Sequence, residues 1–236
     1  MDIDKRKKNS ILLAWDELPD FMKKEEVRPY WEMLNNKRGQ LRLKRVCDIV
    51  LSISMIFLLL VPMIIIAIIV KTDSSGSVFF RQVRVTQYGR EFKIIKFRTM
   101  YDKKNDSGSL VTIANDQRIT KVGKVLRKYR LDEIPQLFNV LVGDMSFVGT
   151  RPEVPKYVKK YENEWLATLL LPAGITSECS IRYKDEEIYF KTIKDVDIYY
   201  ENYILPTKMK INLISIICYN FFTELWILLR TIYSLF

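Results

Sequence analysis

An aspartate and a glutamate, followed by an aliphatic residue and a proline, occur twice in the sequence, at residues 16–19 and 132–135. Such a pair can begin a helix, bind a metal ion, or supply a nucleophile and its helper. The 236-residue chain contains no histidine, so acid–base or nucleophilic chemistry must come from Asp, Glu, Lys, Tyr or Cys. The three cysteines form no Cys-x-x-Cys pair, which predicts a reducing compartment and no structural zinc.

The second copy is followed by the pattern of an amphipathic helix. Apolar residues recur at i, i+3, i+4 and i+7 from Ile134, and Gly143 is placed to end the helix. Asp132 then fits the N-cap, with Glu133 and Pro135 in the first turn. There the helix dipole would keep the carboxylate ionised and could also hold a phosphate. Asp132 is thus a candidate nucleophile and Mg²⁺ ligand, although the tetrapeptide alone favours a plain capped helix.

The first copy lies in different surroundings. Acidic residues follow it, and no Gly-x-Arg-Pro turn comes after it. We interpret it as a helix start in a polar arm, residues 1–44, in which Trp15, Leu18, Phe21 and Met22 share one helical face and dock on the protein or the bilayer.

The middle of the chain is strongly basic. Residues 71–130 hold 15 Lys or Arg against five Asp or Glu, and the whole chain has a net charge of +10. Residues 77–100 are expected to form two strands around a turn at Tyr88-Gly89, and a helix with a basic face is expected from Thr120. An anionic partner is therefore predicted. Nucleic acid is disfavoured because no DNA- or RNA-binding signature is present, and a solvated or lipid-facing basic surface is the alternative.

Residues 49–70 form an uncharged apolar run of 22 residues, long enough to cross a bilayer as a helix. Basic residues flank both ends, which favours the cytoplasmic side for both, and Pro62 interrupts the helical hydrogen bonds. A re-entrant helix and a single span fit these residues equally. The tail, residues 211–236, resembles an interfacial helix, with an ordinary packing helix as the alternative.

Five segments occur in a characteristic order: "KRVCDIVLS", Pro62, "KIIKFRTM", "RLDEIPQLFNVLVGDMSFVGTRP" and "LLPAGITS". With them, residues 42–235 resemble the bacterial sugar transferases of the small monotopic phosphoglycosyl transferase type. The resemblance implies transfer of a phosphosugar from a UDP-sugar to polyprenol phosphate at the cytoplasmic face of the bacterial inner membrane, with Mg²⁺ as cofactor and UMP as product. It also implies a re-entrant helix broken at Pro62, with both ends cytoplasmic.

The resemblance assigns roles to particular residues. Asp132 would be the nucleophile and a Mg²⁺ contact, and Glu133 would assist it. Phosphate-binding roles fall to the cations listed here: Arg127, Arg151, Lys96 and, more loosely, Arg98. Three departures occur: Val61 replaces a serine, Thr150 replaces a proline, and "SECSIRYKDEE" replaces a segment that bears on nucleotide and sugar recognition, leaving Arg182 and Lys184 as weak candidates.

The elements and the resemblance together predict an α+β, helix-dominated monotopic protein with a small antiparallel β-hairpin, a re-entrant membrane helix and C-terminal interfacial helices. The expected parts are the arm 1–44, the membrane helix 45–71, a cytoplasmic catalytic domain 72–200 and an interfacial segment 201–236. The alternative function is a non-enzymatic scaffold that binds anionic lipid through its basic residues. The sequence does not identify the sugar.

Overall fold

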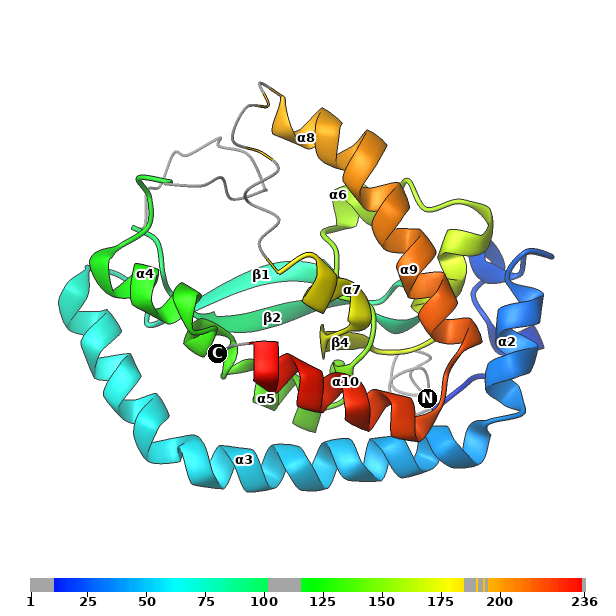
Figure 1. Cartoon of the computed structure of the whole chain (residues 1–236), viewed down its shortest axis with the longest axis horizontal. Helices are drawn as coiled ribbons and strands as arrows, with labels where there is room; N and C mark the ends of the chain where they lie inside the picture. The colour runs from blue at the N-terminus through cyan, green and yellow to red at the C-terminus, as the bar shows by residue number, and fades with distance from the viewer. Residues whose placement is uncertain (1–10, 102–115, 185–189, 191–192, 194, 235–236) are drawn as a thin grey trace.

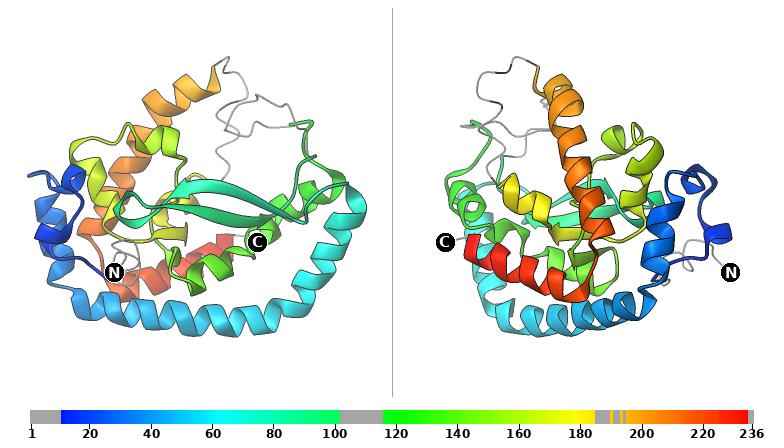
Figure 2. Two further views of the ribbon diagram at one scale, coloured as in Figure 1. Left: turned by 180° about the vertical axis from the view of Figure 1, so that it is seen from behind. Right: turned by 45° about the vertical axis from the view of Figure 1, so that its right-hand side comes forward.

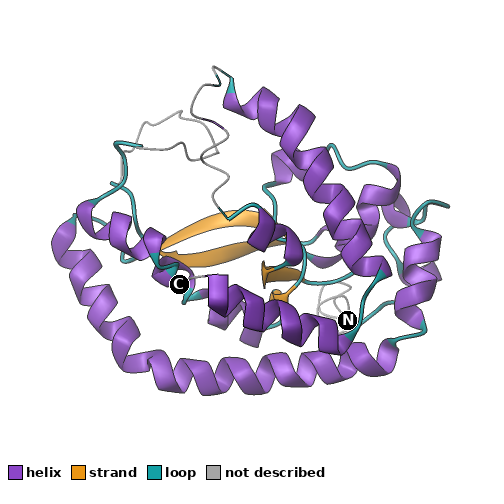
Figure 3. Ribbon diagram, viewed as in Figure 1, coloured by secondary structure: helices purple, strands orange, loops and turns teal. Residues whose placement is uncertain are grey.

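The computed structural model describes residues 11–101, 116–184, 190, 193 and 195–234. Parts of the predicted arm (1–10), basic stretch (102–115) and divergent segment (185–187) lie outside the described residues. Helices surround two separate pairs of strands near the centre (Figure 3). The predicted helix-dominated α+β class with a small antiparallel hairpin is confirmed.

The N-terminal arm packs on the body of the protein. It contains two 3-10 turns, η1 (Trp15–Glu17) and η2 (Asp20–Met22), and the helix α2 (Arg28–Asn35). Leu18 and Met22 are buried in the largest apolar core, whereas Phe21 is 46% exposed. The first Asp-Glu-aliphatic-Pro copy therefore lies at a short 3-10 turn, with Asp16 and Glu17 exposed and Leu18 buried. The predicted single helical face is not found, because two separate turns replace the helix.

The helix α3 (Arg38–Asp73) is the one helix in the described part of the chain that is long and apolar enough to cross a membrane. Figure 1 shows α3 running under the body of the protein and then turning upward. The helix is continuous from Arg38 to Asp73 and contains Pro62. Proline removes one helical hydrogen bond, which explains a bend without a break in the ribbon. Most of the apolar run is exposed: Val50, Ile53, Phe57, Leu58, Val61, Ile64, Ile65 and Ile68.

The two strand pairs place the polar residues of the centre. Strands β1 (Phe79–Val85) and β2 (Glu91–Phe97) form the expected antiparallel hairpin around η3 (Gln87–Gly89), where Tyr88 and Gly89 have positive φ. Strands β3 (Met145–Val148) and β4 (Ala173–Thr176) form a parallel pair that was not predicted, since its partners are far apart in sequence. Gly149 and Gly174 touch there, so that a Cβ on Gly174 would lie 2.2 Å from the nitrogen of Gly149.

The remaining elements cover this centre. They are α4 (Lys121–Lys128), η4 (Leu131–Glu133), α5 (Gln136–Leu141), α6 (Pro155–Val158), η5 (Asn163–Leu169), α7 (Glu178–Arg182), α8 (Val196–Tyr199), the π-helical turn η7 (Tyr200–Ile204), α9 (Leu205–Ile217) and α10 (Phe221–Ser234). The helix α10 lies along α3 in both views of Figure 2. Its outer face is apolar and exposed, at Phe222, Leu225, Trp226, Leu229, Ile232 and Tyr233. In contrast, α9 buries Leu205, Met209 and Leu213 in the main core, so it is a packing helix.

Candidate active site

The Asp132-Glu133 pair lies in the 3-10 turn η4, between α4 and α5. Arg130 adopts a left-handed conformation (φ 55°), which turns the chain just before the pair. The prediction that Asp132 caps a helix is wrong: Pro135 occupies the N-cap of α5, and no side chain caps that helix. Proline lacks a backbone N–H and fits the beginning of a helix, so α5 begins after it. The prediction that Gly143 follows the helix end with positive φ is confirmed.

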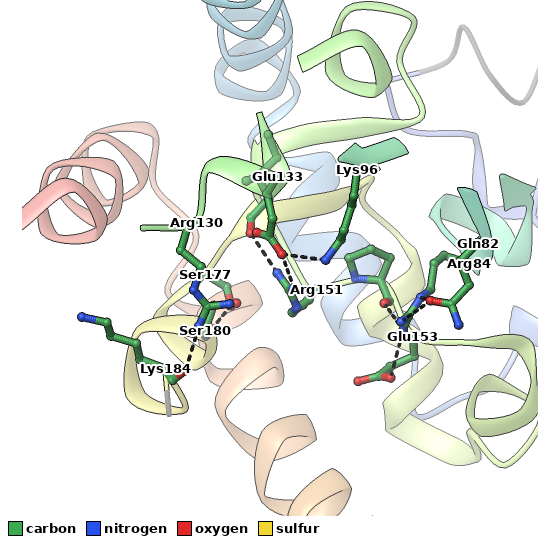
Figure 4. Close-up of polar contacts among 12 residues, drawn as sticks. Gln82, Arg84, Lys96, Arg130, Glu133, Arg151, Glu153, Ser177, Ser180 and Lys184 are labelled. Atoms are coloured by element: carbon green, nitrogen blue, oxygen red, sulfur yellow. Dashed lines mark hydrogen bonds and ion pairs between the residues drawn. The ribbon is translucent and has the colours of Figure 1, made fainter. Parts of the chain in front are cut away.

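Glu133 is held between two cations. Its Oε1 accepts hydrogen bonds from Lys96 Nζ at 2.7 Å and from an Arg151 guanidinium nitrogen at 2.6 Å (Figure 4). Burial by itself raises the pKa of Glu133, but Arg151 and Lys96 outweigh burial and hold this pKa well below its usual value. Glu133 is therefore a fixed anion, and Lys96 and Arg151 are brought together by it.

The surroundings of Asp132 shift its pKa in the direction opposite to that of Glu133. It is 7% exposed, and its Oδ1 has no hydrogen-bond partner. Burial raises the pKa of Asp132, while Lys96 and Arg127 act in the opposite direction. The expected stabilisation of its anion by a helix N-terminus is not found, because Asp132 does not occupy the N-cap. A buried carboxylate oxygen with no protein donor is poorly solvated, which makes it reactive toward an electrophile.

The pair opens into a large cavity of about 1320 Å³. Among the described residues, the lining includes nine cations: Arg84, Lys96, Lys124, Arg127, Lys128, Arg130, Arg151, Lys184 and Lys208. It also includes apolar residues of the two helices with exposed apolar faces, α3 and α10: Leu51, Met55, Leu59, Leu228 and Ile232. The cavity can therefore receive a phosphate-bearing group and an apolar chain at the same time.

Residues 39–236 match the bacterial sugar transferase family. The chain belongs to this family. It is 43% identical over 122 residues to a UDP-N-acetylgalactosamine-undecaprenyl-phosphate N-acetylgalactosaminephosphotransferase of Aeromonas hydrophila, which covers 52% of this chain and 29% of the relative. It is 47% identical over 121 residues to a UDP-glucose:undecaprenyl-phosphate glucose-1-phosphate transferase of Klebsiella pneumoniae, covering 51% of this chain and 26% of that relative. A third relative is an uncharacterized sugar transferase of Bacillus subtilis, 34% identical over 158 residues, with 67% and 77% covered.

Two cations predicted for the site lie elsewhere. Arg98 is 7% exposed and donates to the carbonyl oxygens of Val70 and Ser74 at 3.2 and 2.6 Å. It thereby satisfies carbonyl groups at the C-terminal end of α3, as basic side chains often do at helix ends. Arg182 donates to Glu178 at 2.9 Å and does not line the cavity, whereas Lys184 does.

The attachment of α3 to the site was not predicted from sequence. Lys44 donates to the carbonyl oxygen of Val148 at 2.8 Å and forms an ion pair with Glu224 of α10 at 2.7 Å. Asp48 accepts hydrogen bonds from the Ser146 hydroxyl at 2.7 Å and from the Phe147 N–H at 3.2 Å. The first turns of α3 thus hold strand β3, which leads directly to Arg151. In the sequence, the only sign of this attachment was that the polar residues Lys44 and Asp48 lie next to the apolar run.

Arg130 is another site residue without an assigned role before the structure. It precedes the carboxylate pair, lines the cavity, and donates to the Lys184 carbonyl oxygen at 2.7 Å (Figure 4). This contact links η4 to the chain that follows α7. The left-handed backbone of Arg130 turns the chain at this position, and the residue type alone did not indicate this turn.

The site can hold a divalent cation only with help from a ligand. In the described ranges, no group of three or more Asp, Glu or Cys side chains is arranged to bind a metal. The unpartnered Oδ1 of Asp132 nevertheless fits one coordination position. Mg²⁺ is commonly bound by one or two carboxylates together with substrate phosphates and water, so the residues fit this ion.

Proposed function

We propose that this protein is a phosphoglycosyl transferase that moves a phosphosugar from a UDP-sugar to polyprenol phosphate and releases UMP. The observation that carries this proposal is the cavity, which is lined by cations, by apolar residues of α3 and α10, and by two adjacent carboxyl groups. The pKa of one carboxyl group, Asp132, is raised, and that of the other, Glu133, is lowered. The names of the relatives support the two substrates. The product would begin the assembly of a surface glycan.

In the first step, a carboxylate oxygen of Asp132 attacks the β-phosphorus of the UDP-sugar. The bond from that phosphorus to the bridging oxygen breaks, UMP leaves with the electron pair, and an aspartyl-phosphosugar forms. In the second step, a phosphate oxygen of polyprenol phosphate attacks the same phosphorus and releases the Asp132 carboxylate. The oxygens that gain negative charge face Lys96, Arg127 and Arg151, which stabilises both transition states.

Glu133 has a positioning role in this scheme. As a fixed anion, it holds Lys96 and Arg151 beside Asp132. Asp132 Oδ1 would contribute a ligand to Mg²⁺, which supplies charge neutralisation to the phosphates when bound.

The membrane arrangement of α3 supports acceptance of a lipid substrate. Both ends of α3 contact the same folded body, through Lys44 and Asp48 at the beginning and through Arg98 at the end. Since one body cannot lie on both sides of a bilayer, these contacts favour a re-entrant helix bent near Pro62, with the catalytic part at the cytoplasmic face of the bacterial inner membrane. The exposed apolar faces of α3 and α10 would then lie in one leaflet.

The test is a UMP-release assay in detergent or nanodiscs with Mg²⁺, polyprenol phosphate and a panel of UDP-sugars. We expect wild-type protein to release UMP, and Asp132→Asn to lower the rate about 10³-fold or more because a neutral amide is a poor nucleophile. With a donor labelled in the sugar, the label should remain on wild-type protein when the acceptor is omitted. Asp132→Asn should retain the melting temperature, since burial already disfavours the charge at this position.

A scaffold that binds anionic lipid makes a different prediction. It requires that Asp132→Asn leave both membrane binding and the cellular role intact. Absence of UMP release by well-folded wild-type protein across a broad donor panel would favour the scaffold. Release that persists in Asp132→Asn would instead reject Asp132 as the nucleophile.

A further inference from the structure

The helix α9 carries two buried polar residues on a face that is otherwise apolar. Lys208 and Asn212 are four residues apart and therefore share one side of the helix. They are 8% and 5% exposed, among the buried Leu205, Met209 and Leu213. Burying an amide without a hydrogen-bond partner is costly, so an asparagine inside a packing helix calls for a partner or a ligand.

Both side chains line the large cavity. The Lys208 ammonium donates to the Tyr200 hydroxyl at 3.2 Å, and it lies 4.8 Å from the centre of the Tyr200 ring and 5.8 Å from that of Tyr183. Tyr183 follows α7, which packs against α9. Two aromatic rings and a positive charge therefore form this part of the cavity wall.

Asn212 differs from its neighbours in having an unused side chain. Within the described residues, the Asn212 amide takes part in no side-chain hydrogen bond. The amide nitrogen and oxygen each retain some accessible surface, because neither is among the fully buried atoms that lack a hydrogen-bond partner in the described chain. The amide is thus largely buried, unpaired and open to the cavity, which is the condition of a group that pairs with a bound molecule.

We propose that Asn212 and Lys208, with Tyr183 and Tyr200, form the subsite for the uracil ring of the UDP-sugar. This inference rests on the proposed function. A planar amide offers a donor and an acceptor side by side, and the imide edge of uracil offers the complementary acceptor and donor. The tyrosine rings suit a flat ring, and the Lys208 ammonium can donate to a uracil carbonyl oxygen.

The subsite and Asp132 line the same cavity, as a single bound donor requires. The β-phosphate must meet Asp132, and the acceptor chain must pass the apolar residues of α3 and α10. Uridine extends from the β-phosphate through a further phosphate and the ribose, so it needs polar partners at some distance from Asp132. The helix α9 contributes Lys208 and Asn212, together with Met209, to the lining.

The test compares two α9 variants with a matched control. Asn212→Leu keeps the volume and removes the amide, Lys208→Met removes the charge, and Lys210→Met changes an exposed lysine of the same helix. We expect Asn212→Leu to raise the Kd for UMP and the KM for the UDP-sugar about 10- to 100-fold, the effect of losing two hydrogen bonds, with little change in kcat. Lys208→Met should raise both constants about 3- to 10-fold, and Lys210→Met should change neither.

UMP binding is measured by calorimetry on the full chain, and Asn212→Ser serves as a second variant if Asn212→Leu does not fold. Restoration of UMP affinity by Asn212→Gln would support amide pairing. Unchanged UMP affinity together with a raised KM for the UDP-sugar would overturn the uracil assignment and place the sugar at this wall. Wild-type values for both constants in the variants would also overturn it. If wild-type protein neither binds UMP nor releases it, the proposed function fails instead.

Discussion

Lys96 is expected to set the pH at which the carboxylate pair works. It donates to Glu133 at 2.7 Å and lowers the pKa of Asp132 as well as that of Glu133. In Lys96→Met both pKa values should rise. Because the proposed first step needs an ionised Asp132, the acidic limb of the kcat/KM profile should then move to higher pH.

The size of the shift follows from the geometry. An opposite charge within about 4–6 Å lowers a carboxyl pKa by about 1–3 units. Arg151 remains on Glu133 in the variant, and Arg127 continues to act on Asp132, so each pKa should rise by only the lower part of that range. The acidic limb should therefore move by about one pH unit.

Stability should change in the same direction. Because the pKa of Glu133 is depressed in the folded protein, its stabilising effect is complete above its unfolded value near 4.5 and is lost as the pH falls through the lower folded value. A higher folded pKa of Glu133 in Lys96→Met removes part of this stabilisation at pH 7. Removing Lys96 also relieves the burial that lowers its own pKa, so the net loss should be about 1 kcal/mol, or about 2–4 °C in Tm.

The assay is UMP release measured from pH 4.5 to 9, together with the thermal unfolding of each variant at pH 7. Lys93→Met is the matched control, because Lys93 lies on the same strand but is exposed. If the acidic limb of the kcat/KM profile lies at the same pH in wild type, Lys96→Met and Lys93→Met, the argument that Lys96 lowers the pKa values of the carboxylate pair is refuted. An equal shift in both variants would instead attribute the effect to net charge.

Two further substitutions test how the site is held. Asp48→Ala removes the acceptor of two buried hydrogen bonds, so it should lower the unfolding free energy by about 2–3 kcal/mol and also lower kcat. Asp48→Asn should retain most of the stability and most of kcat. Equal losses in the two variants would contradict the role of the acceptor oxygens. Gly174→Ala places a methyl group against the backbone of Gly149, so it should lower the unfolding free energy by about 1–3 kcal/mol and reduce kcat by displacing Arg151. Gly39→Ala is the control and should leave kcat unchanged, because its methyl group meets nothing within 4 Å. A wild-type kcat in Gly174→Ala would show that the strand contact does not position Arg151.

Local pattern was sufficient to predict the elements near the carboxylate pair. The hairpin turn at Tyr88 and Gly89, the helix beginning after Thr120 and the glycine at position 143 all follow from short-range backbone preferences. Each depends on a few neighbouring residues, which the sequence displays directly. The helix cap at Asp132 was wrong because capping preference alone does not determine whether a 3-10 turn precedes the helix.

Distant contacts could not be predicted in this way. Arg98 is in a basic cluster by sequence, yet it binds the end of α3, more than twenty residues earlier. Asp48 and Ser146 are 98 residues apart, and the parallel pairing of β3 with β4 joins Met145 to Ala173, which are 28 residues apart. Nothing in the sequence connects Asn212 with Asp132, and only the fold shows that both residues border the same cavity.

The fixation of α3 at both ends has a consequence for its relation to lipid. A helix that crosses a bilayer adjusts to hydrophobic thickness by tilting, at modest cost. In this protein, Lys44 and Asp48 hold one end and Arg98 holds the other, so the depth and slope of the apolar run are set by the folded body. In the proposed re-entrant arrangement, the lipids, and not the helix, must adapt, and the free-energy penalty depends on how easily one leaflet is deformed around Pro62. The proposed transfer reaction should therefore respond to the packing of that leaflet more than to the thickness of the whole membrane.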